Sequence, residues 1–288
     1  MTKYLITGGN GQLGTDIILE LEARKIKSYY APNIDILDIT NKENVDDVIS
    51  KYKPNIILHC AAYTNVDKAE DEKDLCYNIN VNGTKNIIEA SKKINSKLIY
   101  ISTDYVFDGS KEGYYETYDK GNPINYYGKT KYLGELEVLK YIKSFVVRVS
   151  WLYGINGNNF VKTMLRLAET NNKLRIINDQ FGSPTYTPDL AKFLLDISNT
   201  DKYGIYHATN SGITNWYEFA QTIFKLNNIN IELEPITTKE YKTNAKRPLN
   251  SKLSKKSIID NNFNLLPEWQ DALKRYTKIN KKQLTKRK

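Results

Sequence analysis

Tyr127 and Lys131 are four residues apart in Asn-Tyr-Tyr-Gly-Lys-Thr-Lys (residues 125–131), a stretch that predicts the first turns of a helix. Residues at i and i+4 share a helix face, so the two side chains should lie close together. A free phenol has a pKa of about 10, and a nearby cation favours the phenolate. The pair is therefore a candidate proton donor or acceptor in which Lys131 lowers the pKa of Tyr127. Tyr and Lys are both abundant here, so the pair is informative only beside a second motif.

A glycine-rich turn near the N-terminus supplies that second motif. Gly8, Gly11 and Gly14 form a G-x-x-G-x-x-G pattern that follows a short apolar strand and precedes a helix pattern at residues 17–21. Glycine permits a tight turn and lets a diphosphate approach the bare backbone. The N–H groups at the start of the helix favour phosphate. The pattern predicts a dinucleotide-binding site, and an ordinary glycine turn is the alternative interpretation.

Strands and helices alternate through the first half of the chain. Apolar strands are predicted at residues 4–7, 28–31, 55–60, 97–102 and 144–149, with amphipathic helices at 12–25, 42–53, 78–94 and 126–142. This alternation predicts an α/β fold with a Rossmann-type, doubly wound parallel sheet. The candidate residues for chemistry follow the first, third, fourth and fifth strands. We therefore expect them to meet at the carboxyl edge of the sheet.

Strands and helices alternate less regularly in the second half of the chain. Helices are predicted at residues 159–170, 188–198, 215–227 and 267–279, with short strands near 174–177, 204–208 and 231–236. We expect an NAD(P)-binding Rossmann domain over residues 1–150. A smaller α/β lobe over residues 151–288, interleaved with the first domain, should cover the strand ends and leave a cleft for a second ligand.

Composition excludes several classes of protein. No run of 18 apolar residues and no signal peptide is evident in the 288 residues, so we expect a cytoplasmic protein with no membrane partner. The two cysteines, Cys60 and Cys76, are expected to be reduced thiols, and two His with two Cys make no zinc site. The net charge of +9 is spread along the chain. The basic tail at 281–288 is expected to be a frayed, solvated terminus, so no nucleic-acid partner is predicted.

Longer motifs narrow the interpretation. They are GGNGQLG (8–14), AAYTNVDKAE (61–70), NVNGT (80–84), STDYVFDG (102–109), YYGKTK (126–131), RVSWLYG (148–154), NNFVKTMLRLA (158–168), NDQFGSPT (178–185) and KRPLNSKL (246–253). With them the chain resembles the extended short-chain dehydrogenases/reductases and, within these, the dTDP-4-dehydrorhamnose reductase family. The resemblance covers essentially the whole chain. It implies NAD(P)H-dependent reduction of the C4 keto group of dTDP-4-dehydro-L-rhamnose to dTDP-L-rhamnose, a precursor of cell-surface polysaccharide.

The resemblance also implies roles for individual residues. Tyr127 would donate a proton to the C4 oxygen, Lys131 would bind the nicotinamide ribose, and Thr103 would hydrogen-bond the carbonyl. The implied cofactor-binding residues are Gly8, Gly11, Gln12, Leu13, Gly14, Asp38, Ile39, Ala61, Ala62, Tyr63, Tyr127 and Lys131. The implied substrate-binding residues are Thr64, Val66, Thr103, Asp104 and Trp151.

Other interpretations of these residues stay open. Thr103 could be an ordinary hydroxyl at a strand end, Asp104 could cap a turn, and Trp151 could be a core aromatic. Arg247 could be structural or could contact a diphosphate.

The chain departs from the pattern of the family it resembles at the end of the second strand. Rossmann-type NAD sites usually carry an acidic residue there, which holds the adenosine ribose. The matching residue is Asn33, with Asp35 close by, and no arginine replaces the acid, although Lys25 and Lys27 are near. Without a carboxylate at residue 33, repulsion of a 2′-phosphate is reduced. We expect NADPH as the cofactor, with NADH tolerated.

A second departure concerns metal. Some members of the resembled family dimerise around a magnesium ion held by three carboxylates per subunit. Only Asp16 is acidic at the matching positions, and the other two are Pro188 and Ile279. We therefore expect no metal site and a monomer or homodimer without a magnesium bridge.

Two alternatives to this function stay open at this point. One is another nucleotide-4-keto-sugar reductase or an epimerase, which would use the same fold. The other is a non-catalytic nucleotide-binding regulatory subunit that resembles the reductases. The presence of Thr103, Tyr127 and Lys131 together favours an enzyme, because regulatory relatives tend to lose part of such a set.

Overall fold

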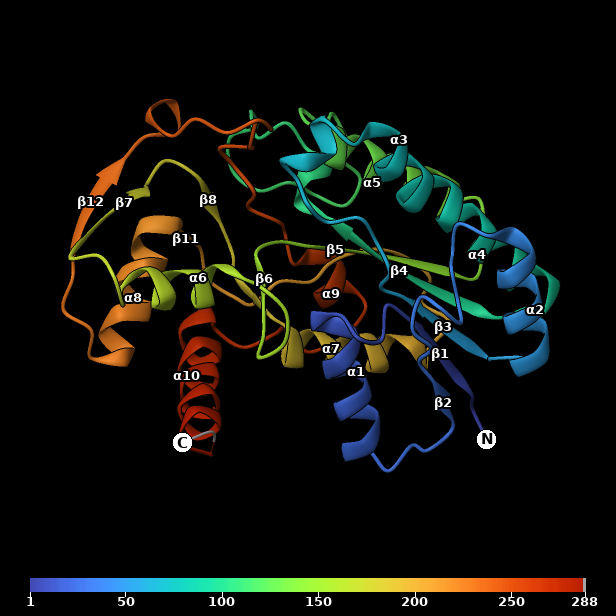
Figure 1. The fold of residues 1–288 in the computed structure, drawn as a ribbon. Helices are drawn as coiled ribbons and strands as arrows, with labels where there is room; N and C mark the ends of the chain where they lie inside the picture. The colour runs from blue at the N-terminus through green and yellow to red at the C-terminus, as the bar shows by residue number, and fades with distance from the viewer. Residues whose placement is uncertain (287–288) are drawn as a thin grey trace.

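A six-stranded parallel sheet forms the main body of the computed structural model, which describes residues 1–286 and the side chains through residue 281 (Figure 1). Its strand order is β10-β5-β4-β3-β1-β2. The strands are β1 (Tyr4–Thr7), β2 (Tyr29–Tyr30), β3 (Ile56–His59), β4 (Lys97–Thr103), β5 (Ser144–Val149) and β10 (Gly204–His207). Every neighbouring pair in this sheet is parallel. The predicted Rossmann-type fold is confirmed.

Helices cover both faces of this sheet because its strands are apolar on both sides. Helices α1 (Gln12–Ala23) and α7 (Thr187–Ser198) pack on one face, in a core with Ile6. Helices α2 (Lys42–Tyr52), α4 (Thr84–Lys93) and α5 (Tyr126–Val138) pack on the other, in a core with Leu5. Successive strand residues point to opposite faces, so β1 contributes to both cores. This arrangement directs the helix starts toward the carboxyl edge of the sheet.

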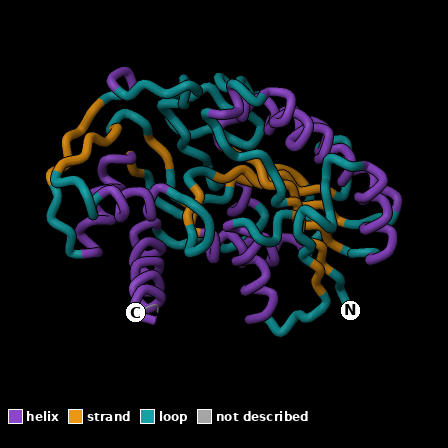
Figure 2. Tube along the Cα trace, in the orientation of Figure 1, coloured by secondary structure: helices purple, strands orange, loops and turns teal. Residues whose placement is uncertain are grey.

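A smaller group of elements follows β5. Strands β7 (Lys173–Ile177) and β12 (Glu232–Ile236) pair in parallel and pack with α6 (Phe160–Leu167), α8 (Trp216–Asn227) and α10 (Trp269–Lys286) around a third core (Figure 2). Four two-residue strands make the remaining pairs: β6 (Leu152–Tyr153) with β9 (Thr185–Tyr186), and β8 (Phe181–Gly182) with β11 (Thr214–Asn215). Two short helices, α3 (Lys73–Tyr77) and α9 (Lys256–Asp260), complete the chain.

Several elements differ from the sequence-based expectations. The strand predicted near 204–208 is β10, which joins the main sheet beside β5 rather than the smaller group. The helix predicted over 78–94 begins as a π-helical segment, Asn78–Gly83. Helix α10 continues to Lys286, so the tail is helical further than expected, and residues 287–288 lie outside the described part. None of the helices described is long and apolar enough to span a membrane.

Candidate active site

The strand register brings the predicted site residues to one edge of the sheet. Thr7 at the end of β1 aligns with His59 of β3, and Thr103 at the end of β4 aligns with Val149 of β5. The segments after these four strands carry the glycine turn, Ala61–Tyr63, Asp104 and Trp151. The expected convergence of these segments at the carboxyl edge is therefore seen in the structure.

The glycine turn packs tightly against its own helix and against β3. A Cβ on Gly14 would lie 2.3 Å from the carbonyl oxygen of Gly8, and Gly8 itself has a φ of +67°. A Cβ on Gly8 would lie 2.9 Å from the backbone nitrogen of Ala61. Helix α1 starts after Gly11, whose position provides no side-chain cap for the first N–H groups. The turn is thus a cradle of bare backbone at a helix start, which fits a diphosphate.

Residues beside the turn have defined partners. The Gln12 side chain accepts a hydrogen bond of 2.8 Å from the amide of Asn159, and Leu13 is buried. Asp38 accepts hydrogen bonds from the backbone and hydroxyl of Thr40, and buried Ile39 packs against Gly83. Asn159 was not predicted as a site residue, although it lies in a motif that the sequence singled out.

Asn33 and Asp35 share an exposed loop after β2. The Asn33 amide donates to a carboxylate oxygen of Asp35 at 3.3 Å, and the Asn33 side-chain oxygen accepts from the backbone of Ile36. A carboxylate therefore lies beside Asn33 although residue 33 itself is neutral. The Asp35 carboxylate therefore restores part of the repulsion toward a 2′-phosphate that the neutral Asn33 was expected to remove.

Helix α5 presents Tyr127 and Lys131. Its N-cap is Asn125, which accepts a 2.7 Å hydrogen bond from the backbone of Gly128 and donates to the carbonyl of Lys246. The Tyr127 ring meets the Tyr105 ring edge-on, with 6.0 Å between centroids. The Lys131 side chain is buried, with its ammonium 4.1 Å from the centre of the Tyr100 ring.

The pKa of Tyr127 runs against the sequence-based expectation. Desolvation raises the pKa of Tyr127 above its ordinary value, the nearby Asp104 carboxylate raises it further, and the Thr103 hydroxyl only partly opposes this. Burial lowers the pKa of Lys131 to about 7, against the effect of Glu135. The expected lowering of the Tyr127 pKa is therefore wrong as a net direction, because local spacing takes no account of desolvation.

Thr103 and Asp104 form a buried polar pair beneath Tyr127. The Thr103 hydroxyl donates to one Asp104 carboxylate oxygen at 3.0 Å and accepts from the backbone of Tyr105. The other Asp104 oxygen accepts from the hydroxyl of Ser251. Burial raises the pKa of Asp104 to about 6, although both hydrogen bonds lower it. Asp104 also begins the 3₁₀ turn Asp104–Val106, so its carboxylate is engaged within the protein.

The loop after β3 is held by Asn80, which sequence reasoning did not select. Its side chain accepts from the backbone of Tyr63 at 2.9 Å and donates to the Tyr63 carbonyl and to Thr130 of α5. Asn80 lies in the π-helical segment, a local distortion often found at functional sites. The only sequence signal was its place in Asn-Val-Asn-Gly-Thr.

Thr64 is exposed and Val66 half-buried in the same loop. The loop is joined to the C-terminal segment by Arg247, whose guanidinium contacts the Asp67 carboxylate at 2.6 Å and 3.2 Å.

Trp151 has a φ of +50°, unusual for a bulky residue, and its ring stacks on Trp216 of α8 with 3.8 Å between centroids. Trp216, which was not predicted, donates its indole N–H to Gln180. The stack places an aromatic surface where the two groups of elements meet.

Asp16 and Ile279 stand at two of the positions that the resemblance matches to metal-binding carboxylates. Asp16 is buried, accepts from Thr187 and has its pKa raised by burial. Ile279 is 43% exposed on α10. Within residues 1–281, no group of three or more His, Cys, Asp or Glu side chains could hold a metal ion.

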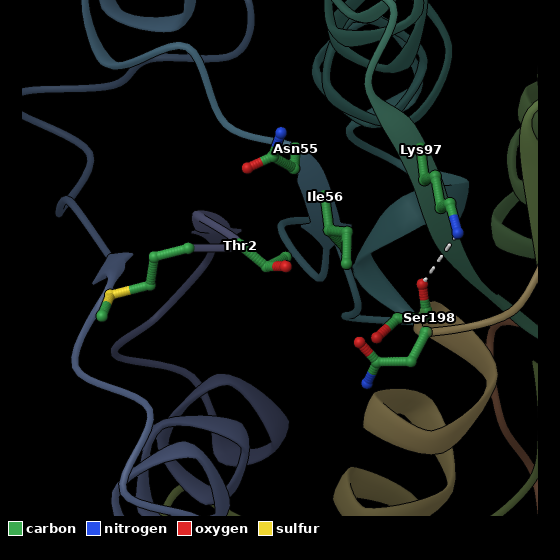
Figure 3. Close-up of a pocket in the computed structure, with 7 residues that line it drawn as sticks. Thr2, Asn55, Ile56, Lys97 and Ser198 are labelled. Carbon is green, nitrogen blue, oxygen red and sulfur yellow. Dashed lines mark hydrogen bonds between the residues drawn. The ribbon is translucent and has the colours of Figure 1, made fainter.

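A hollow also lies at the opposite, amino-terminal edge of the sheet, beside Asn55, Lys97 and Ser198 (Figure 3). The Lys97 ammonium there lies 3.5 Å from the Ser198 carbonyl. The predicted site residues are not among those that line it, so this hollow is separate from the candidate active site.

Comparison with known proteins agrees with this geometry. The sequence model of the family described as "RmlD substrate binding domain" matches residues 2–281. A dTDP-4-dehydrorhamnose reductase from Aggregatibacter actinomycetemcomitans is 43% identical over 95% of this chain and 98% of that protein. The chain belongs to the dTDP-4-dehydrorhamnose reductase family. The family that the motifs predicted is confirmed.

Solved members of this reductase family share the whole fold. The dTDP-4-dehydrorhamnose reductase from Bacillus anthracis, solved in complex with NADP, is 43% identical, with a TM-score of 0.93 over 96% of this chain and 99% of that chain. The Clostridium acetobutylicum member is 41% identical, with a TM-score of 0.95 over 97% of this chain and 100% of that chain.

Proposed function

We propose that this protein catalyses NADPH-dependent reduction of the C4 keto group of dTDP-4-dehydro-L-rhamnose, which yields dTDP-L-rhamnose for cell-surface polysaccharide. The observation that carries the proposal is that Thr103 lies beside Tyr127 and that Lys131 lies near Cys60, which borders the glycine turn at Gly8. Membership of the reductase family and the relatives of that name support the choice of substrate.

The cofactor proposal rests on the glycine cradle. Bare backbone at Gly8 and Gly14 and the uncapped start of α1 suit the diphosphate of a dinucleotide. Ala61 borders the turn at Gly8. Tyr63 and Ile39 are further proposed cofactor contacts, and Lys131 would hold the nicotinamide ribose. NADPH, when bound, supplies hydride to C4. The B. anthracis relative that was solved with NADP supports the phosphorylated form. Because residue 33 is neutral and no arginine replaces the usual acid there, we propose that NADH is tolerated.

Side chains of the protein would stabilise the negative charge on the C4 oxygen and supply its proton. An ordinary phenol, with a pKa of about 10, already keeps its proton at neutral pH, and desolvation and Asp104 raise the pKa of Tyr127 further, so we propose Tyr127 as a proton donor. The Thr103 hydroxyl would donate a second hydrogen bond to the same oxygen, which requires it to turn from Asp104. Donors fixed in a buried site stabilise negative charge that grows during reduction.

Substrate would lie over the segments that follow β3, β4 and β5. Thr64, Val66, Asp104 and Trp151 are the proposed sugar contacts, and Trp216 extends the aromatic surface of Trp151.

We infer a division into a Rossmann domain over residues 1–150 and an interleaved nucleotide-sugar lobe over 151–288. We also propose a cytoplasmic monomer or homodimer without a magnesium bridge, since Asp16 bonds to Thr187 within the chain.

A coupled assay tests the proposal. The keto sugar is generated in situ, NADPH is added, and loss of the reduced nicotinamide absorbance is followed together with the sugar product. Formation of dTDP-L-rhamnose with equimolar NADPH oxidation is the expected result. Release of a 4-epimer with no net redox change would instead assign an epimerase. No turnover on any keto sugar, together with co-purification of a larger enzyme, would assign a regulatory subunit.

A further inference from the structure

A buried glutamate continues the catalytic face of helix α5. Tyr127, Lys131 and Glu135 are spaced at i, i+4 and i+8, and all three therefore project from one side of the helix. Lys131 is 3% exposed and Glu135 is fully buried, so this side of α5 faces the protein interior. Ionised side chains are rarely buried so completely without a specific partner.

The partner of Glu135 is Arg148 on β5. The guanidinium donates from Nε to both carboxylate oxygens at 3.0 Å and 3.2 Å, and from Nη2 at 2.8 Å. Arg148 is also held by the Thr117 carbonyl, by His207, and by the Phe107 ring 5.0 Å away. An arginine side chain does not lose its proton in proteins. The pair therefore fixes a carboxylate one helical turn beyond Lys131.

The surroundings of Lys131 contain few other groups that favour a positive charge. His59 and Cys60, at the end of β3, face Lys131 from one side. Cys76 of α3 and the Tyr100 ring of β4 face it from two other elements. The His59 pKa is lowered to about 3, by burial first, and so its ring adds no charge. Burial likewise raises the pKa of both thiols. Glu135 is the first of the groups that favour the Lys131 ammonium, and the other two are the thiols of Cys60 and Cys76.

We propose that Glu135, held by Arg148, is a positioning residue that keeps the Lys131 side chain in its ammonium form during turnover. The proposal rests on the proposed function, because it assumes that Lys131 acts in the reaction as a cation. It goes beyond that function by giving a reason for a buried ion pair that touches neither the glycine turn nor Tyr127. The competing explanation is that the pair only fastens α5 to β5.

The decisive measurement is the titration of Lys131 itself. Protein with ¹³C at the lysine ε-carbons is followed by NMR across pH, and the Lys131 signal is assigned by its loss in Lys131→Arg. We expect Glu135→Gln to move the Lys131 midpoint to lower pH by about one unit or more, since a neighbouring opposite charge is lost. Glu137→Gln is the matched control, because Glu137 pairs with Lys85 and Lys140 at the surface of the same helix.

Folding must be separated from titration. Glu135→Gln leaves the Arg148 guanidinium buried without its carboxylate, which is strongly destabilising. The double variant Glu135→Gln/Arg148→Met removes both charges and should show a smaller downward shift of the Lys131 midpoint, because the loss of the more distant Arg148 cation partly offsets the loss of the carboxylate. Glu135→Asp keeps the charge and should titrate close to the wild type. An unchanged Lys131 midpoint in a folded Gln variant would overturn the proposal. So would a result in which Glu135→Asp folds and both Gln variants are unfolded, because the ion pair would then serve only to hold the fold together.

Kinetics supply an independent readout. Because the ammonium is needed, the alkaline limb of kcat/KM should shift to lower pH in Glu135→Gln by the same amount as the NMR midpoint. A lower kcat with an unchanged pH profile would also argue for a structural role. If the wild-type protein reduces no keto sugar, the proposed function fails, yet the NMR titration still decides whether Glu135 sets the charge of Lys131.

Discussion

Gly128 and the carbonyl oxygen of Tyr105 lie so close that a Cβ on Gly128 would be 2.1 Å from that oxygen. The first turn of α5 therefore packs directly on the 3₁₀ turn that follows β4. This contact places Tyr127 beside Tyr105 and above Thr103. The position of the proton donor thus depends on the absence of one methyl group.

Gly128→Ala should displace the first turn of α5 and move Tyr127 away from Thr103. A shift of about 1 Å at a reacting group can lower turnover by about 10²-fold, so we expect a fall of that order in kcat. Lys129→Ala, at an exposed position in the same turn, is the control and should keep its activity. Normal kcat in Gly128→Ala would show that the contact does not fix Tyr127.

Tyr127→Phe should abolish most turnover and leave cofactor binding nearly unchanged. The ring preserves the packing against Tyr105, whereas the lost hydroxyl is the proton donor, so we expect a loss of about 10²–10⁴ in kcat. Tyr126→Phe is the matched control, since Tyr126 contacts Lys73 and Lys129 rather than Thr103. Steady-state rates and NADPH titration measure the two effects, and an active Tyr127→Phe beside an inactive Tyr126→Phe would contradict the assignment.

Cofactor preference should be mild. Asn33 removes a charge at the end of β2, but its contact with Asp35 keeps a carboxylate nearby. We expect kcat/KM to favour NADPH over NADH by roughly 3–30-fold. Asn33→Asp should move the ratio toward NADH, and Asp35→Asn should move it further toward NADPH. A wild-type protein that prefers NADH tenfold would mean that Asp35 or another carboxylate holds the ribose.

Asp104 should make the folded protein less stable as pH rises. Its pKa is raised from 3.8 to about 6 by burial. Below about pH 4 both states hold the proton; between the two pKa values only the folded state holds it, so rising pH favours unfolding. The contribution lost from about pH 4 to pH 7 is about 3 kcal/mol. Urea unfolding of Asp104→Asn should lack this loss.

Asp108 provides a comparison of opposite sign. Hydrogen bonds, first from the Ser110 backbone, lower the pKa of Asp108 to about 2. Its stabilisation is therefore present above about pH 4 and is lost as pH falls toward 2. Asp108→Asn should be less stable than wild type near neutral pH and approach it in acid. The same pH trend in both variants would contradict the assigned directions.

The sheet and its active edge could be predicted because their signals are local. Apolar strands, a glycine turn and an i, i+4 pair are each read within a few residues, and parallel topology then brings them together. The contact of Ser251 with Asp104 spans 147 residues, and Trp216 reaches Trp151 from another helix. Sequence spacing carries no signal for such contacts. The direction of the Tyr127 pKa failed for a related reason, since burial depends on the whole fold.

Strand β10 lies far beyond β5 in the sequence, and this has a consequence for how the chain folds during synthesis. Strand β5 pairs with β4 on one side, but its other edge is covered only when Gly204–His207 dock beside Phe145–Arg148. A nascent chain that has emerged only as far as β5 therefore exposes an unpaired, apolar strand edge, which is a template for aggregation. His207 arrives on the same strand to contact Arg148. The last strand of the sheet thus closes both the exposed edge and the surroundings of the buried ion pair behind Lys131.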